Sequence, residues 1–242
     1  MNRPILVAAA ILCGATAAAR PVKIEHDSSA LEFSYAWPSE AAAIPALDRK
    51  FRADLEKAYR QALASGRDDQ KLYQAQQREG AQDFYSMTWT TAGETSRLLS
   101  LKNELSTFTG GAHPNTGYDA LIWDRKLNRP TSMDALLGGA GKLSAVTRPT
   151  YCKALDEERV KRREGEKLDL PEFNACPKYS DLAIGPLDSN ADGRFDAIDF
   201  VASPYLAGPY VEGEYEVRVP VTSKLIAALK PEFRSSFEAQ RQ

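Results

Sequence analysis

Residues 187–219, LDSNADGRFDAIDFVASPYLAGPYVEGEYEVRV, carry the clearest structural pattern in the chain. An acidic loop leads into an apolar run, a turn rich in proline and glycine follows, and Tyr215, Val217 and Val219 then alternate with polar residues. Alternation with a period of two is typical of a strand that buries one face. The pattern therefore predicts strands over 181–187, 195–202 and 215–221.

The acidic loop at the start of this stretch has the spacing of a calcium-binding loop. Side-chain oxygens fall at positions 1, 3, 5 and 12 of a twelve-residue frame, with glycine at position 6. This spacing predicts a weak structural Ca²⁺ site, with an affinity of about 0.1–1 mM. A hairpin whose tight turn is Asp192-Gly193, with the acids facing water, fits the same residues and stays open as the alternative. The candidate ligands are Asp188, Asn190, Asp192, Arg194, Asp196 and Asp199.

Residues 1–19 have the features of an export signal. Arg3 precedes an apolar run, and Ala17-Ala18-Ala19 matches the small-x-small cleavage rule. The segment is too short to span a bilayer, and Cys13 lacks the small preceding residue that lipidation requires. We therefore expect cleavage after Ala19 and a periplasmic or secreted protein.

The composition of the remaining chain limits its partners and its redox chemistry. Removal of residues 1–19 changes the net charge from −2 to −3, which gives no support for nucleic acid as a partner. No later segment is apolar enough to cross a membrane. Cys152 and Cys176 remain as an isolated pair, which in an oxidising compartment predicts a disulfide. Free redox thiols are the alternative, but the C-x-x-C spacing is missing.

Strand and helix patterns alternate along the first part of the mature chain. His26 lies in the mature N-terminus, which is expected to be loose. Apolar residues at helical spacing indicate an amphipathic helix, followed by a polar connector. The predicted elements are a strand over 31–37, a helix over 44–62 that ends near Gly66, and strands over 84–91 and 97–108 joined by a turn at 92–94.

The second part of the chain continues the same mixture. The charged segment 156–167, DEERVKRREGEK, is expected to be a solvated helix face. Strands followed by helices and paired strands predict an α+β fold, with two small subdomains of mostly antiparallel sheet packed with helices, over 20–110 and 111–242. The predicted elements are a loop over 109–118, a strand over 120–124, helices over 132–137 and 143–155 with a bend or restart at Pro149, and a closing helix that Thr222 caps.

Three segments carry a family resemblance: GGAHPN at 110–115, MDALL at 133–137 and SPYLAGPYVEGEYEVRVP at 203–220. They resemble the exported domain of RsiV-type anti-sigma factors and PdaC-type peptidoglycan deacetylases, and the preceding strand, helix and hairpin resemble its smaller N-terminal domain. The resemblance implies two α+β subdomains outside the cytoplasm, with lysozyme or the cell wall as the ligand. We expect neither direct sigma-factor control nor deacetylation, because no sigma-binding segment, membrane span or deacetylase module is recognised in the sequence.

Candidate binding residues lie in two of these segments. His113 and Asn115 belong to the glycine-rich loop, and Tyr205 and Tyr210 to the Pro-Gly turn, where tyrosines offer large contact area with a polar tip. His113 is also the obvious proton-transfer group, with capping of loop carbonyls as its alternative role. For Tyr205 and Tyr210, core packing is the alternative to surface binding. Tyr215 is expected to point inward.

These residues favour a binding role over catalysis. With two histidines a three-histidine zinc site is excluded, and no H-E-x-x-H, G-x-S-x-G or P-loop motif occurs. We predict a non-enzymatic binding protein of the cell envelope that recognises a lysozyme-like hydrolase or cell-wall glycan. The alternative is a hydrolase of peptidoglycan fragments that uses His113 or a pair of carboxylates.

Overall fold

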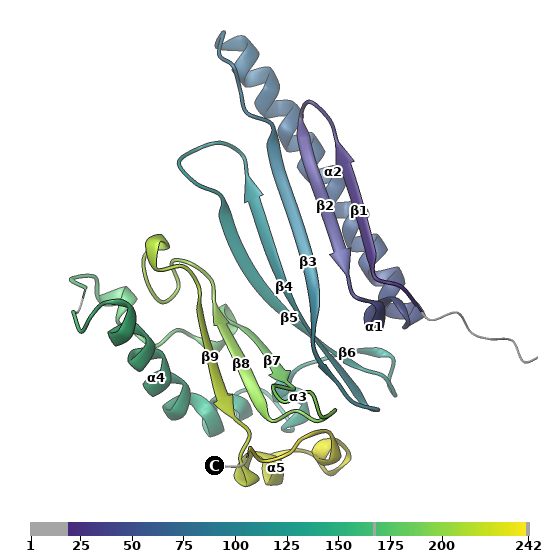
Figure 1. Ribbon diagram of the computed structural model, residues 1–242, viewed down its shortest axis with the longest axis vertical. Coiled ribbons are helices and arrows are strands. Elements are labelled where there is room, and N and C mark those ends of the chain that lie inside the picture. The colour runs from purple at the N-terminus through teal and green to yellow at the C-terminus, as the bar shows by residue number, and fades with distance from the viewer. Residues whose placement is uncertain (1–18, 167, 241–242) are drawn as a thin grey trace, which may run out of the picture.

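The computed structural model describes residues 19–166 and 168–240, so the predicted export signal and Cys13 lie outside the described residues, apart from Ala19. The chain forms a mixed α+β structure with two sheets packed with helices, which confirms the predicted fold class (Figure 1). One sheet has six strands in the order β1-β2-β3-β4-β5-β6, and the other has three in the order β7-β8-β9.

The six-stranded sheet contains one parallel pair, β2 and β3, and its other neighbours are antiparallel. The parallel pair is connected through two helices, because parallel strands need a crossover. The bounds are β1 (Val22–Asp27), β2 (Leu31–Trp37), α1 (Ser39–Ala42), α2 (Pro45–Ala75), β3 (Asp83–Glu94), β4 (Leu98–Phe108), β5 (Asn115–Asp124) and β6 (Arg129–Thr131).

Helix α2 buries the predicted apolar stripe but is longer than predicted. Leu47, Phe51 and Leu55 pack in one cluster with β2. The predicted end near Gly66 is wrong, because the helix continues to Ala75 through the segment expected as a connector. Gly66 is buried, and a Cβ there would lie 2.3 Å from the carbonyl oxygen of Ala30. The glycine therefore allows close approach of the β1–β2 turn and does not end the helix.

Two further predictions for this sheet were wrong. Residues expected to be loose form β1, an edge strand that pairs only with β2 and places His26 opposite Phe33. Strand β1 is mostly exposed and polar, so it lacks the apolar alternation from which the other strands were predicted. The turn expected at 92–94 lies at 95–97, where the Thr95 hydroxyl accepts hydrogen bonds from the backbone amides of Arg97 and Leu98.

The six-stranded sheet also runs past the expected end of the first subdomain at residue 110. That position lies in the connection between β4 and β5, which are hydrogen-bonded neighbours from Leu98↔Asp124 to Thr107↔Asn115. The strand expected over 120–124 is correspondingly longer at its start. Strand pairing therefore joins the expected subdomains within one sheet.

The three-stranded sheet is antiparallel and is formed by the strands predicted over 181–187, 195–202 and 215–221, with bounds that differ by up to two residues. Thr222 caps the closing helix as predicted, with its hydroxyl accepting from the Leu225 amide. The bounds are α3 (Met133–Leu136), α4 (Lys142–Arg162), η1 (Pro171–Phe173), η2 (Tyr179–Asp181), β7 (Ala183–Leu187), β8 (Ala197–Ala202), η3 (Tyr210–Glu212), β9 (Tyr215–Pro220), α5 (Ser223–Ala228) and η4 (Pro231–Ser236).

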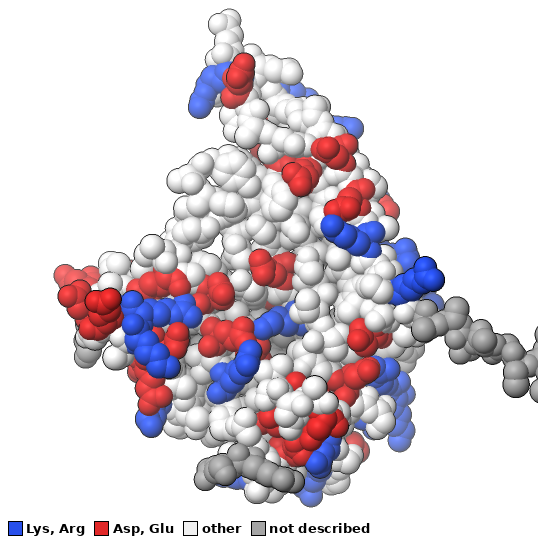
Figure 2. Space-filling model, in the orientation of Figure 1, with Lys and Arg blue, Asp and Glu red and all other residues white. Residues whose placement is uncertain are grey.

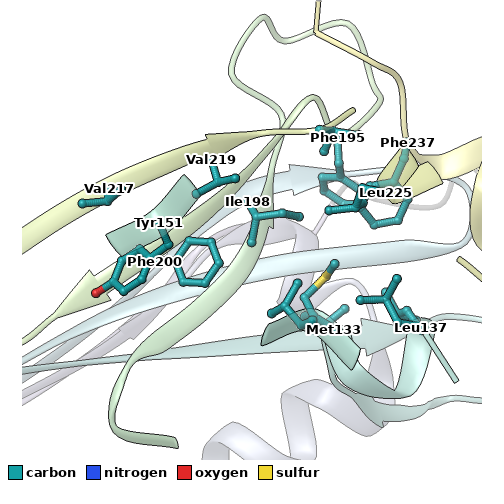
Figure 3. Close-up of a cluster of buried hydrophobic side chains, with 14 of the residues drawn as sticks. Met133, Leu137, Tyr151, Phe195, Ile198, Phe200, Val217, Val219, Leu225 and Phe237 are labelled. Carbon is teal, nitrogen blue, oxygen red and sulfur yellow. The ribbon is translucent and has the colours of Figure 1, made fainter. Parts of the chain in front are cut away.

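Helix α4 covers one face of the small sheet. Tyr151 of α4 stacks on Phe200 of β8 with ring centroids 4.8 Å apart, and Ile198 and Val219 extend this cluster (Figure 3). Pro149 lies inside the helix, which continues through it. Tyr215 is fully buried, as predicted.

The predicted disulfide is present and ties α4 to the loop that follows it. Cys152 and Cys176 are bonded, with their Cα atoms 5.6 Å apart. The two sheets also touch each other, since the Asp188 amide after β7 donates to the Ala92 carbonyl of β3 at 3.0 Å. Over the residues that the structure describes, none of the helices combines the length and apolar character needed to cross a bilayer.

Candidate functional site

The structure brings three of the four candidate binding residues together. His113 lies in the β4–β5 loop, and Tyr205 and Tyr210 lie in the β8–β9 loop, 92 or more residues further along the chain. The His113 ring stacks on Tyr210 with centroids 3.6 Å apart and an interplanar angle of 15°. The centroids of Tyr205 and Tyr210 are 5.7 Å apart. Residues far apart in sequence thus form one aromatic cluster between the two sheets' loops.

Hydrogen bonds fix the orientation of the His113 ring. Its Nδ1 lies 2.8 Å from the Pro114 carbonyl oxygen, which can only accept, so Nδ1 carries the hydrogen. In the neutral ring Nε2 then accepts from the Tyr205 hydroxyl at 3.3 Å. No carboxylate bonds to this imidazole within the described part of the chain, so the arrangement positions the ring and offers it no acid-base partner.

The two loop segments that carry this cluster are partly exposed and contain no charged side chain. Tyr205 is 51% exposed and Val211 is 90% exposed, while His113 and Tyr210 are half-buried. Residues 105–118 and 203–211 contain no charged side chain, and Figure 2 shows white surface over the β4–β5 loop with charged groups gathered below it. We call His113, Tyr205, Tyr210 and Val211 the aromatic patch. A largely apolar centre with a charged surround is typical of a recognition surface.

Asn115, the fourth candidate, does not join the patch. It is exposed at the first position of β5 and pairs in register with Thr107 of β4. The polar contact between β5 and the β8–β9 loop is made by Ser203, whose hydroxyl accepts a hydrogen bond from the Tyr118 amide at 3.1 Å. A binding role for Asn115 stays a prediction.

The β8–β9 loop has a demanding backbone. Tyr205 has a φ of 72°, a left-handed conformation that few non-glycine residues adopt, and its amide donates to the Gly208 carbonyl at 3.1 Å. Gly208 is buried, and a Cβ there would lie 2.0 Å from a carboxylate oxygen of Glu212. Such a conformation persists only where surrounding contacts enforce it.

Three arginines at the end of α4 hold other parts of the same loop, and we call Arg159, Arg162 and Arg163 the arginine clamp. Arg159 donates to the Ala207 carbonyl at 3.0 Å and to Ala175 at 2.8 Å, next to the disulfide. Arg163 also donates to the Ala207 carbonyl, at 3.2 Å. We call the β8–β9 loop the tyrosine loop and the segment after α4 that contains Cys176 the disulfide loop. The clamp therefore connects these two loops through helix α4.

The rest of the clamp holds the far side of the same loop. Arg162 donates to the carbonyls of Glu212 and Glu214 and lies 4.1 Å over the Tyr215 ring. Arg163 makes two 2.9 Å bonds to the Glu212 carboxylate. Burial alone would raise the pKa of Glu212, but the bonds from Arg163 and Tyr215 outweigh it and hold that pKa below its ordinary value.

Sequence reasoning missed the clamp. The expectation of a solvated face at 156–167 was wrong for Arg159, which is 4% exposed, and for Arg163, whose side chain is 5% exposed. Arginine at positions i, i+3 and i+4 lies on one side of a helix, and this spacing was the available signal. It could not be distinguished from a surface charge run because the carbonyls that the arginines satisfy are distant in sequence.

The acidic loop uses its oxygens for backbone amides. Asp188 accepts from the amides of Asp192 and Gly193, Asn190 from that of Asp192, and Asp196 from the amide and hydroxyl of Ser189. Arg194 pairs with Glu238. In residues 19–166 and 168–240 no three His, Cys, Asp or Glu side chains gather as a metal-binding group. The calcium site stays a prediction.

Asp199, the last expected calcium ligand, points to the other sheet. It is 4% exposed, and one oxygen accepts from Lys102 of β4 at 3.1 Å, while Lys102 also bonds Glu216 of β9 at 3.1 Å. Burial raises the pKa of Asp199 in spite of the Lys102 ammonium. Burial would likewise raise the pKa of Glu216, but bonds from Arg218 and Lys102 lower it. These two carboxylates are the pair with opposite pKa displacements, and Lys102 joins the sheets through them.

The chain is similar to one family model and to solved structures of another family. Residues 24–116 match the family model described as deacetylase PdaC, a span that runs from β1 to the start of β5. No curated protein matches the chain significantly. The match covers the N-terminal part, whereas the quoted segments of resemblance lie mainly after it, and the resemblance to RsiV-type anti-sigma factors stays a prediction.

Two solved structures of the DUF3298 family are similar over nearly the whole chain. One, from Bacteroides fragilis NCTC 9343, has 15% identity and a TM-score of 0.60, covering 91% of this chain and 98% of its own. The other, from Pseudomonas aeruginosa PAO1, has 15% identity and a TM-score of 0.55, covering 92% of this chain and 98% of its own. The chain thus has the fold of these DUF3298 structures, and its residues 24–116 carry the likeness to the PdaC-type domain.

Proposed function

We propose that the chain is an exported, non-enzymatic binding protein of the cell envelope that recognises a lysozyme-like hydrolase or cell-wall glycan through the aromatic patch. The observation that carries this proposal is the convergence of His113, Tyr205 and Tyr210 from two loops, beside the exposed Val211. Tyrosine side chains give large, rigid contact area with a polar tip, which suits both protein and sugar surfaces.

The arginine clamp supports this proposal because it orders the loop before any ligand arrives. Its guanidinium groups satisfy the Ala207, Glu212 and Glu214 carbonyls of the loop. Ordering a mobile loop on binding costs free energy, and a loop that is already held avoids that cost. A preformed patch therefore favours recognition of a fixed surface over adaptation to many.

The disulfide supports the export part of the proposal. A bond between Cys152 and Cys176 forms and persists in oxidising compartments. Cleavage of the predicted signal after Ala19 would deliver the chain there, with the described fold beginning shortly afterwards at β1. Mass spectrometry of protein purified from the envelope fraction tests both points, through the mature N-terminus and the absence of alkylatable thiols.

Binding and turnover assays on the same variants test the function. The protein is titrated with immobilised lysozyme and with soluble muropeptides, and product formation, including deacetylation of N-acetylated glycan, is followed in parallel. Tyr205→Ala with Tyr210→Ala should weaken binding about 30-fold, the usual effect of removing a central aromatic contact. Saturable binding without turnover is the expected result. Turnover of muropeptides by the wild type that is lost in His113→Ala would overturn the proposed binding role.

Histidine substitution has a matched control in this chain. His26 of β1 is exposed and its ring lies 4.2 Å from that of Tyr59, so it repeats the histidine-tyrosine contact of the patch at a remote position. His113→Ala should reduce affinity, whereas His26→Ala should leave it unchanged. Equal losses in the two variants would remove the aromatic patch as the binding surface.

The alternative function, a peptidoglycan hydrolase, is favoured by one observation. Asp199 and Glu216 have pKa values displaced in opposite directions, as an acid-base pair needs. Their shared contact with Lys102 and the burial of Asp199 fit a structural role equally. Asp199→Asn with retained fold and lost muropeptide turnover would establish the hydrolase.

A further inference from the structure

A second concave site lies apart from the aromatic patch. A cavity of about 590 Å³ opens between the β5–β6 turn, α3 and η4, elements that lie together at the lower end of the molecule (Figure 1). Its volume is in the range of small-molecule binding sites. Four cationic side chains and two carboxylates line it, so its net charge is +2. The charged residues are Arg97, Lys126, Arg129, Lys230, Asp124 and Glu232.

A buried ion pair fixes the inner wall of this cavity. Arg97 donates two 2.8 Å bonds to Asp124, and its guanidinium lies 4.8 Å from the centre of the Phe233 ring. Asp124 is 1% exposed and also accepts from the amides of Lys126 and Leu127 at 2.9 and 3.0 Å. The β5–β6 turn is therefore pinned, and with it the backbone positions of the lining residues.

Three of the four cations that line this cavity are exposed and belong to no ion pair of the described residues. Across residues 19–166 and 168–240, Lys126, Arg129 and Lys230 form no ion pair, whereas the adjacent Arg125 pairs with Glu94. All three side chains belong to exposed residues. Unpaired cations that share one cavity with a guanidinium leave a positive field open to a ligand.

We propose that this cavity binds a small molecule that carries a phosphate group. Arginine and lysine are the usual phosphate-binding side chains, and a phosphate dianion matches the net charge of +2 better than a single carboxylate does. The apolar wall of Leu127, Pro130 and Phe233 gives contact area for the organic part of the ligand. This proposal is independent of the aromatic patch, which shares no lining residue with the cavity.

Titration calorimetry of the full chain at constant low ionic strength tests this site. The probes are inorganic phosphate and glycerol 1-phosphate, each compared with chloride. Saturable binding of both with similar affinity indicates a free-anion site, and tighter binding of the ester indicates a phosphomonoester site. Arg129→Gln with Lys230→Gln should weaken binding of either probe at least tenfold.

A matched control removes the same charge elsewhere. Lys57 and Arg60 are exposed on α2, outside the cavity, and Lys57→Gln with Arg60→Gln should bind both probes as the wild type does. Circular dichroism checks the fold, and Lys126→Gln repeats the test if the double variant melts early. No saturable heat with either probe, an unaffected double variant, or an equal loss in the control would each overturn the proposal.

Discussion

Glu212 is the residue through which the tyrosine loop depends most directly on charge. Its carboxylate accepts two hydrogen bonds from Arg163 and one from the Tyr215 hydroxyl. The pair is nearly buried, with 5% of the Arg163 side chain and 11% of the Glu212 side chain exposed. Because removal of one partner leaves a buried charge uncompensated, the free energy of unfolding should respond strongly to this one carboxylate.

Glu212→Gln should lower the free energy of unfolding at pH 7 by about 3 kcal/mol. The pKa of Glu212 in the folded state is held below its ordinary value of 4.5. The charged carboxylate therefore stabilises the fold above the unfolded pKa, and this contribution is lost as pH falls through the lower folded pKa. Urea unfolding from pH 7 to pH 3 should show the difference between wild type and variant shrinking with acidity.

Glu157 provides the control for this measurement. It lies on α4, the helix that ends at the partner arginines of Glu212, and pairs with Lys153, but 59% of its side chain is exposed. Glu157→Gln should change the free energy of unfolding by no more than about 0.5 kcal/mol at every pH. If the Glu212→Gln difference stayed constant between pH 7 and pH 3, the stabilisation could not be assigned to the charged form.

At the scale of the element, the packing of α2 depends on Gly66, although alanine has the higher helix propensity at such a position. Gly66→Ala should gain about 1 kcal/mol of helix propensity but force the new Cβ to within 2.3 Å of the Ala30 carbonyl oxygen. Overpacking against backbone costs about 1–3 kcal/mol, so we expect net destabilisation. The neighbouring exposed Ser65→Ala is the control, and thermal melting that ranks Gly66→Ala above wild type would contradict the close approach.

The disulfide and α4 act together on the tyrosine loop. Replacing Cys152 and Cys176 with alanine should lower the free energy of unfolding by about 3 kcal/mol in the chain-entropy model. Because Arg159 bonds both Ala175 and Ala207, loosening the disulfide loop should also speed hydrogen exchange at residues 203–213. Exchange at α2 serves as the internal control. Unchanged exchange over 203–213 would show that the clamp does not transmit the constraint.

Sequence patterns predicted the elements whose burial is periodic. The alternation at Tyr215, Val217 and Val219 gave β9, and the stripe of Leu47, Phe51 and Leu55 gave the first turns of α2. The end of α2 was not predictable, because the role of its glycine depends on a carbonyl 36 residues away at Ala30. Local signals report what a residue prefers and carry no information on what approaches it.

The candidate site shows the same limit. The residue types of His113, Tyr205 and Tyr210 identified the surface, because aromatic groups in Pro-Gly loops suit recognition. Their contact could not be derived, since it depends on how two sheets place two loops. The arginine clamp was missed for a related reason: the partners of Arg159 and Arg163 are backbone carbonyls, which every residue has and no sequence pattern marks.

At the scale of the whole molecule, Lys102 couples the two sheets. Its side chain is 29% exposed. Its ammonium group bonds both Asp199 and Glu216 across the contact between β4 and the small sheet. Lys102→Met should lower the free energy of unfolding by about 3 kcal/mol, because Asp199 stays buried without its partner. Lys102→Met with Asp199→Asn should recover part of this loss. A double-mutant cycle in urea measures the coupling, and additive single effects would show that the ion cluster does not join the sheets.

The arrangement of sheets also predicts where a ligand should contact the molecule. The β4–β5 loop belongs to one sheet and the β8–β9 loop to the other, and the aromatic patch spans both. A ligand held there should protect two segments that are distant in sequence. The cavity beside Arg97 and the exposed face of α2 should be unaffected by a ligand of the patch.

A hydrogen-exchange footprint of the full chain, free and saturated with lysozyme or with muropeptides, decides whether the aromatic patch is the recognition surface. We predict slowed exchange over 109–116 and 203–213 together, with no change in α2 and no product formed. Protection confined to other surfaces, or no protection with either ligand at saturating concentration, would contradict that role.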